Sequence, residues 1–312
     1  MTLAEHQFIG GILGGLVATY FLLILPVGIW WKRRQTSRLL VASHDEDGEL
    51  DRSSVEIDPA DLPPPLPVQS RHPLLAVPGP IDLLGVGFYV LLFLVFWKMG
   101  GMAIGEEMKL ELSAGLVTVN ALSFLVLAGL IPALLFWRTQ LVEFFGLRWR
   151  GWRWVFVIAP VFVFGTLLVG GGLLQLSGYP SWAEETFGAK QQEVVEALQT
   201  SQDIGLLVAL AFSAVIVAPL AEEIIFRGYI YRVTRHYSGI WIGALFSGIL
   251  FGVIHFNVLG FPLLALFGIV LALLYERMKT IWVPIACHAA FNGFQVFLTI
   301  LLKYGIVEMP AT

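Results

Sequence analysis

The sequence predicts an all-α protein, a polytopic transmembrane helix bundle with about eight membrane spans. Of its 312 residues, 57% are hydrophobic and 13% are charged, whereas soluble globular domains are roughly 25% charged. The mean hydropathy is +0.78, and several apolar runs approach the roughly 20 residues that a helix needs to cross a bilayer. These features exclude a soluble globular protein, and we expect no nucleic acid among its partners.

Eight apolar runs account for the expected spans. They lie at 8–31, 81–97, 115–137, 154–176, 204–227, 239–256, 261–275 and 281–302. The seventh run is short for a spanning helix, so we expect it to be tilted little, re-entrant or buried among its neighbours. The single cysteine, Cys287, excludes an intramolecular disulfide, and we interpret it as a small core residue.

Three regions are expected along the chain. Residues 1–38 form an N-terminal transmembrane helix with a basic cytoplasmic flank, which we interpret as detachable from the rest. Residues 39–80 form an acidic, proline-rich disordered linker, because so few apolar residues do not offset the entropy lost on ordering. Residues 81–312 form the polytopic membrane domain, with an amphipathic surface helix within 183–200.

The distribution of basic residues predicts the orientation in the membrane. If the segment after the first span is cytoplasmic and the spans alternate, nearly all of the 19 Lys and Arg residues fall inside. The exceptions are Lys98, Lys109, Lys190 and Lys303. Because basic residues favour the cytoplasmic side, we expect both termini outside, in a multi-pass protein of the bacterial cytoplasmic membrane.

Two adjacent carboxylates stand near the end of the fifth run. On a helix, Glu223 and Arg227 are four residues apart and share a face, so they can pair. Glu222 points about 100° away and is not neutralised by the same arginine. Because a carboxylate inside hydrocarbon is costly, we expect a water-filled cavity at Glu222 that opens toward the cytoplasmic side.

Two histidines lie inside later apolar runs. His255 has Phe251 four residues before it, and His288 has Asn292 four residues after it, in each case on one helix face. A lone intramembrane histidine is more often a satisfied helix–helix hydrogen bond than a catalyst. Two histidines, an asparagine and a spare glutamate together favour a functional site.

Three kinds of chemistry fit this set of groups. A glutamate and a histidine can activate a water molecule as general base and orienting partner, and histidine and asparagine can stabilise an oxyanion. Glutamates and histidines can also bind zinc, although the sequence lacks HExxH and Arg227 would oppose a dication. We therefore expect no cofactor, with metal as the weaker choice.

Three motifs in this order resemble those of the CPBP family. They are EExxxR beginning at Glu222, FxxxH beginning at Phe251 and HxxxN beginning at His288. The CPBP family contains the CAAX prenyl endopeptidases and the bacterial Abi and bacteriocin-processing or immunity proteins. The resemblance covers about 137–302 and leaves out the first span and the acidic linker.

The resemblance implies an intramembrane glutamate endopeptidase without a catalytic metal. It assigns four catalytic residues: Glu222 as the base, His255 as its assistant, and His288 with Asn292 as the oxyanion hole. It assigns Glu223 and Arg227 to a structural ion pair, and we expect Phe251 to pack beside His255.

The function predicted is cleavage of peptide bonds in membrane-associated or lipidated substrates by glutamate-activated water. The alternatives are a catalytically silent membrane scaffold or bacteriocin-immunity protein, and a zinc-dependent membrane protease. Proton-coupled transport is disfavoured because the sequence shows no internal repeat. The expected partners are the lipid bilayer and a peptide or lipidated-protein substrate, while substrate identity and oligomeric state stay open.

Overall fold

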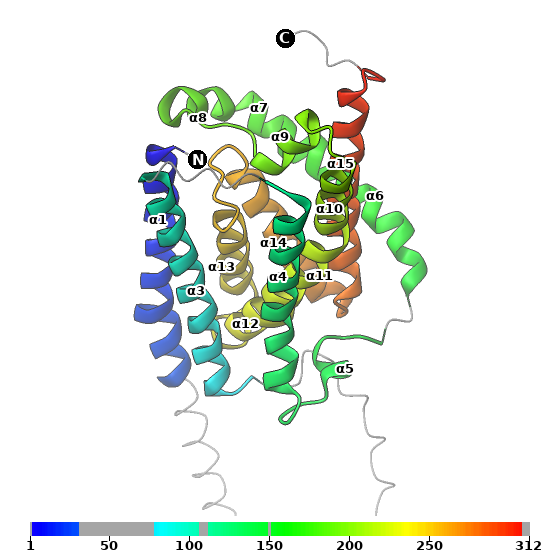
Figure 1. Ribbon diagram of the computed structural model, residues 1–312. Helices are drawn as coiled ribbons and strands as arrows, with labels where there is room; N and C mark the ends of the chain where they lie inside the picture. The colour runs from blue at the N-terminus through cyan, green and yellow to red at the C-terminus, as the bar shows by residue number, and fades with distance from the viewer. Residues whose placement is uncertain (1, 31–77, 106–111, 149–150, 308–312) are drawn as a thin grey trace, which may run out of the picture.

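The computed structural model describes residues 2–30, 78–105, 112–148 and 151–307. Over these residues the chain forms helices and connections, with no β-strand. Within these described ranges, seven helices are long and apolar enough to cross a membrane. They pack side by side as a bundle (Figure 1), which confirms the predicted all-α polytopic fold.

The elements before residue 204 include four of these spans. Their bounds are α1 Leu3–Thr19 with a π-helical turn at Tyr20–Ile24, α3 Pro80–Gly105, α4 Ala114–Leu135, α5 Leu141–Phe144, α6 Val155–Gly165, α7 Gly172–Leu176, α8 Tyr179–Phe187 and α9 Glu193–Thr200. A π-helical segment, Thr166–Gly171, joins α6 to α7 within one span.

The elements from residue 204 onward carry the motif residues. Their bounds are α10 Ile204–Phe212, α11 Ala218–Ile225, α12 Arg232–Ser238, α13 Ile240–Val253, α14 Phe261–Met278 and α15 Trp282–Lys303. The predicted amphipathic segment is present as two helices, α8 and α9. Gly188 ends α8 with a left-handed backbone at φ +65°, which glycine adopts without strain.

The count of eight spans needs one correction. The sixth predicted span is α13, which has only 14 residues and is about 21 Å long, shorter than the roughly 30 Å hydrocarbon core. The apolar residues that lengthened it in the sequence, Ile254 and Phe256, lie in the connection after the helix. The seventh predicted span, expected to be short, is α14 with 18 residues.

Glycines bring α13 and α14 into close contact. A methyl group added at Gly248 would lie 2.6 Å from the backbone nitrogen of Ile269, and one at Gly268 would lie 2.9 Å from the Cα of Gly248. Helices in membranes often use such small residues to approach closely. The contact buries one face of α13 against α14, while Trp241, Ile242 and Leu245 of α13 stay exposed.

The first helix, which we interpreted as detachable, packs against α3 in the structure. The ring of His6 stacks on Trp97 of α3 at 4.6 Å, and the Trp97 indole donates to the His6 carbonyl at 3.0 Å. The hydroxyl of Tyr20 donates to the carbonyl of Leu83, and Ile9 is fully buried. Of the predicted linker 39–80, residues 39–77 lie outside the described ranges.

The two ends of the bundle differ in what they contain. Helix α1 begins and α15 ends at one end, together with α8 and α9 (Figure 1); we call this the terminal end. Helices α5 and α12 lie at the other end, which contains Arg138, Arg235, Arg277 and Lys279; we call this the basic end. The start of α1 and the end of α15 therefore lie at the end of the bundle opposite to most of the described basic residues.

The helix that carries the adjacent carboxylates is longer than predicted. It runs without a break over Ile204–Ser238, whereas the sequence predicted an end at 227. Two π-helical segments, Ser213–Val217 and Phe226–Tyr231, flank α11. Such π-bulges occur frequently at functional sites because they shift side chains out of α-helical register.

Candidate functional site

Two glutamates, two histidines and an asparagine of the motifs come together from two helices and one connection. Glu222 and Glu223 lie on α11, His288 and Asn292 on α15, and His255 directly after α13. Each of the two histidines has its Nε2 atom near Oε2 of Glu222, at 4.0 Å for His255 and 3.9 Å for His288. Residues that are far apart in the sequence thus form one cluster in the bundle interior.

Glu223 accepts two hydrogen bonds through one oxygen, Oε1, while its buried Oε2 has no partner among the described residues. Its Oε1 accepts from Nη1 of Arg227 at 2.7 Å and from Nδ1 of His288 at 2.8 Å. Arg227 also donates to the carbonyl of Gly268 at 3.1 Å and lies 4.6 Å from the ring of Phe251. Both members of the Glu223–Arg227 pair have no exposed surface. The ion pair predicted from the i, i+4 spacing therefore forms.

Glu222 differs sharply from its neighbour. Its Oε2 is buried and has no hydrogen-bond partner among the described residues. The distances of 3.9 and 4.0 Å to the two histidines exceed those of a direct hydrogen bond. Distances of this size are typical of two groups that are bridged by hydrogen bonds to a third atom, such as a water oxygen. The carboxylate that the sequence left uncompensated thus has no cation or hydrogen bond from a described residue at Oε2, whereas Glu223, whose own Oε2 is also unpartnered, accepts two hydrogen bonds through Oε1.

The ring orientation of each histidine is fixed by a hydrogen bond at Nδ1. Nδ1 of His255 lies 2.7 Å from the Phe251 carbonyl, and Nδ1 of His288 lies 2.8 Å from the Glu223 carboxylate. A carbonyl and a carboxylate accept, so in each ring Nδ1 carries the hydrogen and donates it. Each Nε2 is consequently the atom directed toward Glu222, with a lone pair when the ring is neutral.

Phe251 acts through both its side chain and its backbone. Its ring lies 4.8 Å from the His255 ring and 5.6 Å from the His288 ring, as the expected packing role requires. Its carbonyl, which the sequence analysis did not consider, holds Nδ1 of His255. The four-residue spacing of this motif therefore places a backbone acceptor under the histidine.

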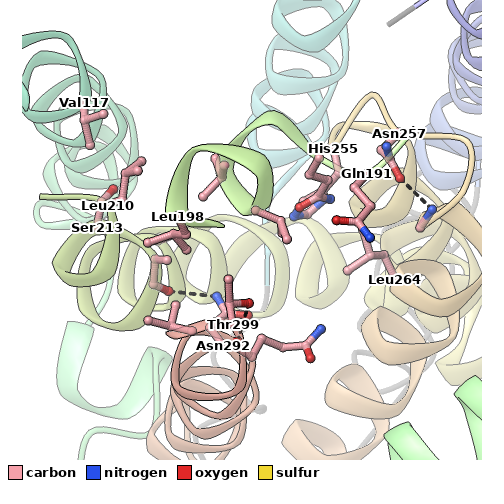
Figure 2. Close-up of a pocket in the computed structure, with 18 of the residues that line it drawn as sticks. Val117, Gln191, Leu198, Leu210, Ser213, His255, Asn257, Leu264, Asn292 and Thr299 are labelled. Atoms are coloured by element: carbon pink, nitrogen blue, oxygen red, sulfur yellow. Dashed lines mark hydrogen bonds between the residues drawn. The ribbon is translucent and has the colours of Figure 1, made fainter. Parts of the chain in front are cut away.

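Asn292 lies one helical turn beyond His288 on α15. Its amide donates to the carbonyl of Ala214 at 2.8 Å, within the π-helical segment Ser213–Val217. An amide NH₂ group has two hydrogens, so this contact orients the side chain and leaves one donor for another group. Figure 2 shows Asn292 on the wall of the cavity.

A cavity of about 890 Å³ extends from these residues. Glu222 and His288 line one part of it, and Gln191 and Gln199 line another. These glutamines lie in or beside α9, which is at the terminal end (Figures 1 and 2). The cavity therefore extends away from the basic end. The expectation that it opens toward the end with most of the basic residues differs from this arrangement, because the sequence does not show on which side of Glu222 the neighbouring helices diverge; which end is cytoplasmic stays a prediction.

The connection after α13 forms part of the cavity wall and was not identified from the sequence. Asn257 donates to the Lys190 carbonyl at 2.8 Å and accepts from the Gly260 amide at 2.7 Å. The Tyr179 hydroxyl donates to the Val258 carbonyl at 2.8 Å; burial raises the pKa of this hydroxyl, so it remains a donor. These contacts anchor the segment that carries His255. The feature of the sequence that could have identified this connection is a polar residue, Asn257, within an apolar stretch.

The described residues do not assemble a metal-binding group. None of their His, Cys, Asp and Glu side chains form a cluster of three or more that could hold a metal ion. Arg227 is bonded to Glu223, one of the two adjacent carboxylates, and would repel a dication. Cys287 is a free, fully buried thiol, as expected for a core residue.

Comparison with known proteins supports the resemblance seen in the motifs. Residues 204–294 match the model of a family described as type II CAAX prenyl endopeptidase Rce1-like. The matched range contains Glu222 and extends through Asn292. The resemblance to the CPBP, or CAAX protease, family is confirmed. The family match is narrower than the range of 137–302 over which we expected it.

A curated relative points to the same class of protein. The chain is 31% identical over 125 residues to a Bacillus subtilis (strain 168) protein named "Putative membrane peptidase YdiL". The match covers 40% of this chain and 50% of the relative, so it spans about half of the relative's length. No solved structure gives a significant match. With seven helices long and apolar enough to cross a membrane among the described residues, the chain is an integral, multi-pass membrane protein.

Proposed function

We propose that the protein is an intramembrane endopeptidase that hydrolyses peptide bonds of membrane-associated or lipidated substrates with water activated by Glu222. The observation that carries the proposal is the unpartnered Oε2 of Glu222, which lies about equally far from Nε2 of His255 and of His288. A buried acceptor without a partner is costly, and here it faces two imidazoles beside a cavity large enough for a substrate.

The reaction begins with a water molecule between Glu222 and His255. Glu222 takes one proton from this water, and the oxygen attacks the carbonyl carbon of the substrate. His255, held at Nδ1 by the Phe251 carbonyl, orients the water through Nε2. As the tetrahedral intermediate collapses, the C–N bond breaks and the proton passes from Glu222 to the leaving nitrogen. The products are a carboxylic acid and an amine.

The oxyanion of the intermediate is stabilised by His288 and Asn292. Asn292 supplies the amide hydrogen that does not point to Ala214. His288 supplies Nε2–H when the ring carries two protons. One preorganised donor of this kind accelerates acyl transfer by about 10²–10³-fold.

No cofactor takes part in this scheme. The nucleophile is generated by a carboxylate and an imidazole, and the oxyanion is held by hydrogen-bond donors. The zinc-dependent alternative requires three or four ligands at one point. The Arg227 guanidinium on the Glu223 carboxylate removes one candidate ligand from that set.

The proposal is tested with the full chain in lipid nanodiscs and a peptide library that includes lipidated peptides. We expect wild type to cleave in the presence of EDTA, and Glu222→Gln to lower kcat/KM by about 10²–10⁴-fold. Glu276→Gln is the matched control, because the same change is made at a glutamate outside the cavity. Wild-type turnover by Glu222→Gln would refute the mechanism. Loss of cleavage with EDTA and its return with zinc would support the metal alternative.

We infer that the basic end lies in the cytoplasm of a bacterial cell, with both chain termini outside. The support is the positive-inside rule applied to the basic end. The cavity then opens on the non-cytoplasmic side, through Gln191. A Gln191→Cys variant should react with a membrane-impermeant maleimide in intact cells, whereas the buried Cys287 should not. Labelling only in inverted membranes would reverse the orientation.

A further inference from the structure

We propose that the cavity binds an extended, electrically neutral stretch of polypeptide through its backbone amides, and not a chain end that bears a free carboxylate. The inference rests on the proposed peptidase function and names the chemical class of its substrate. It is drawn from the polar groups that line the cavity, from their lack of partners and from the charges present there.

Carboxamides dominate the polar lining of the cavity. Two of them, Asn257 and Asn292, hold backbone groups of the protein itself. The other five form no hydrogen bond through their side chains with a described residue: Asn120, Gln191, Gln192, Gln199 and Gln295. A carboxamide offers a donor and an acceptor, as a peptide group does. These side chains therefore match the exposed amides of an extended chain.

The unpartnered carboxamides lie on different sides of the cavity. Asn120 belongs to α4, Gln295 to α15, and Gln199 to α9. Gln191 lies close to His255 and Asn257, as Figure 2 shows. A segment that passes between α4, α9 and α15 toward Glu222 could thus be contacted along its length. Groups arranged on several walls suit an extended backbone better than a single compact head group.

Charged groups are nearly absent from the same lining. Among the described residues that line the cavity, Glu222 is the only Asp, Glu, Lys or Arg. Lys190 is next to Gln191 in sequence, but its side chain is exposed and is not part of the lining. A carboxylate removed from water needs a cation or several N–H donors. A free chain terminus near Glu222 would find no Lys or Arg among the described lining residues and would face a like charge.

The remaining walls are apolar. Leu198, Leu210 and Leu264 project into the cavity from α9, α10 and α14 (Figure 2). Apolar substrate side chains would pack here while the carboxamides contact the backbone. The preferred substrate is consequently a segment with neutral, largely apolar residues on both sides of the cleaved bond.

The test measures peptide binding to the full chain in nanodiscs. His255→Ala is used because it slows cleavage and keeps the charge of Glu222. The probes are two fluorescent peptides of identical neutral sequence, one ending in an amide and the other in a free carboxylate. We expect the amide form to bind at least tenfold more tightly. Equal affinity, tighter binding of the acid form, or no binding of either peptide would overturn the inference.

Two further variants in the same background identify the cause. Gln191→Lys adds a cation to the lining, so it should strengthen binding of the acid form several-fold and reduce the difference. Lys190→Gln is the matched control and should leave both affinities within twofold of the starting values. Loss of the amide preference in Lys190→Gln would overturn the assignment to the lining.

The result separates this inference from the proposed function. Tight binding of the amide form without cleavage of any peptide by wild type would leave the inference standing and count against the peptidase. Cleavage by wild type that requires a free carboxylate near the cleaved bond would have the opposite meaning. It would support the peptidase and overturn the neutral-segment inference.

Discussion

Two glutamates in this protein are almost equally buried and yet have opposite surroundings. The side chain of Glu222 is 10% exposed and that of Glu276 is 14% exposed. Glu276, near the basic end, accepts from Tyr231 at 2.9 Å, Arg235 at 2.8 Å and Lys279 at 2.7 Å. Oε2 of Glu222 accepts from no described residue.

The difference indicates which carboxylate is structural and which is available for chemistry. Nearly all buried polar groups in proteins have partners, so Glu276 follows the general pattern and connects α12 to α14. Glu222 departs from it while facing two imidazoles and a cavity. An unsatisfied buried carboxylate costs free energy of folding, and catalysis is a reason to retain it.

The largest expected effect comes from breaking the satisfied pair beside Glu222. Arg227→Met leaves Glu223 buried without its cation, so we expect it to reduce stability by about 3–5 kcal/mol. The measurement is thermal unfolding in detergent, together with the yield of folded protein. If the melting profile matched that of wild type, the pair would not be the structural element proposed here.

A second substitution controls for the loss of packing. Arg227→Met combined with Glu223→Gln removes both charges, so it should recover part of the stability lost in Arg227→Met alone. If the double variant were as unstable as the sum of the two single variants, the lost stability would not reflect an uncompensated charge.

The next effect concerns the histidine that faces Glu222. His255→Ala removes the group that we propose to orient the water and should lower kcat/KM by about 10²-fold. The melting temperature should change little, because the His255 side chain is 22% exposed. Added imidazole should restore part of the activity. A variant that unfolds early and does not respond to imidazole would show that His255 has only a structural role.

The smallest effect is expected at the satisfied glutamate. Glu276→Gln replaces charge-assisted hydrogen bonds with neutral ones and should cost about 1–2 kcal/mol of stability. Cleavage should stay within twofold of wild type, because Glu276 does not line the cavity. A large loss of activity in a folded Glu276→Gln protein would remove the contrast between the two glutamates.

Much of the site could be predicted because it depends on local geometry. The Glu223–Arg227 pair follows from four-residue spacing on a helix, and it forms at 2.7 Å. The contact between Phe251 and His255 follows from the same spacing. The role of the Phe251 carbonyl was missed, because it depends on the helix ending just before His255. The sequence gives only a weak signal for where a helix ends.

The amino-acid sequence was enough to predict the all-α membrane fold, the concentration of basic residues at one end of the bundle, and the carboxylate that Arg227 does not pair with. Composition and helical spacing suffice for these, because they are properties of single segments in a bilayer. Three other features are visible only in the folded protein: α13 is too short to span, α1 packs on α3, and the cavity extends to the terminal end. These depend on how helices far apart in the chain approach or diverge. Contacts such as Asn257 with Lys190 set that arrangement, and no local pattern in the sequence records them.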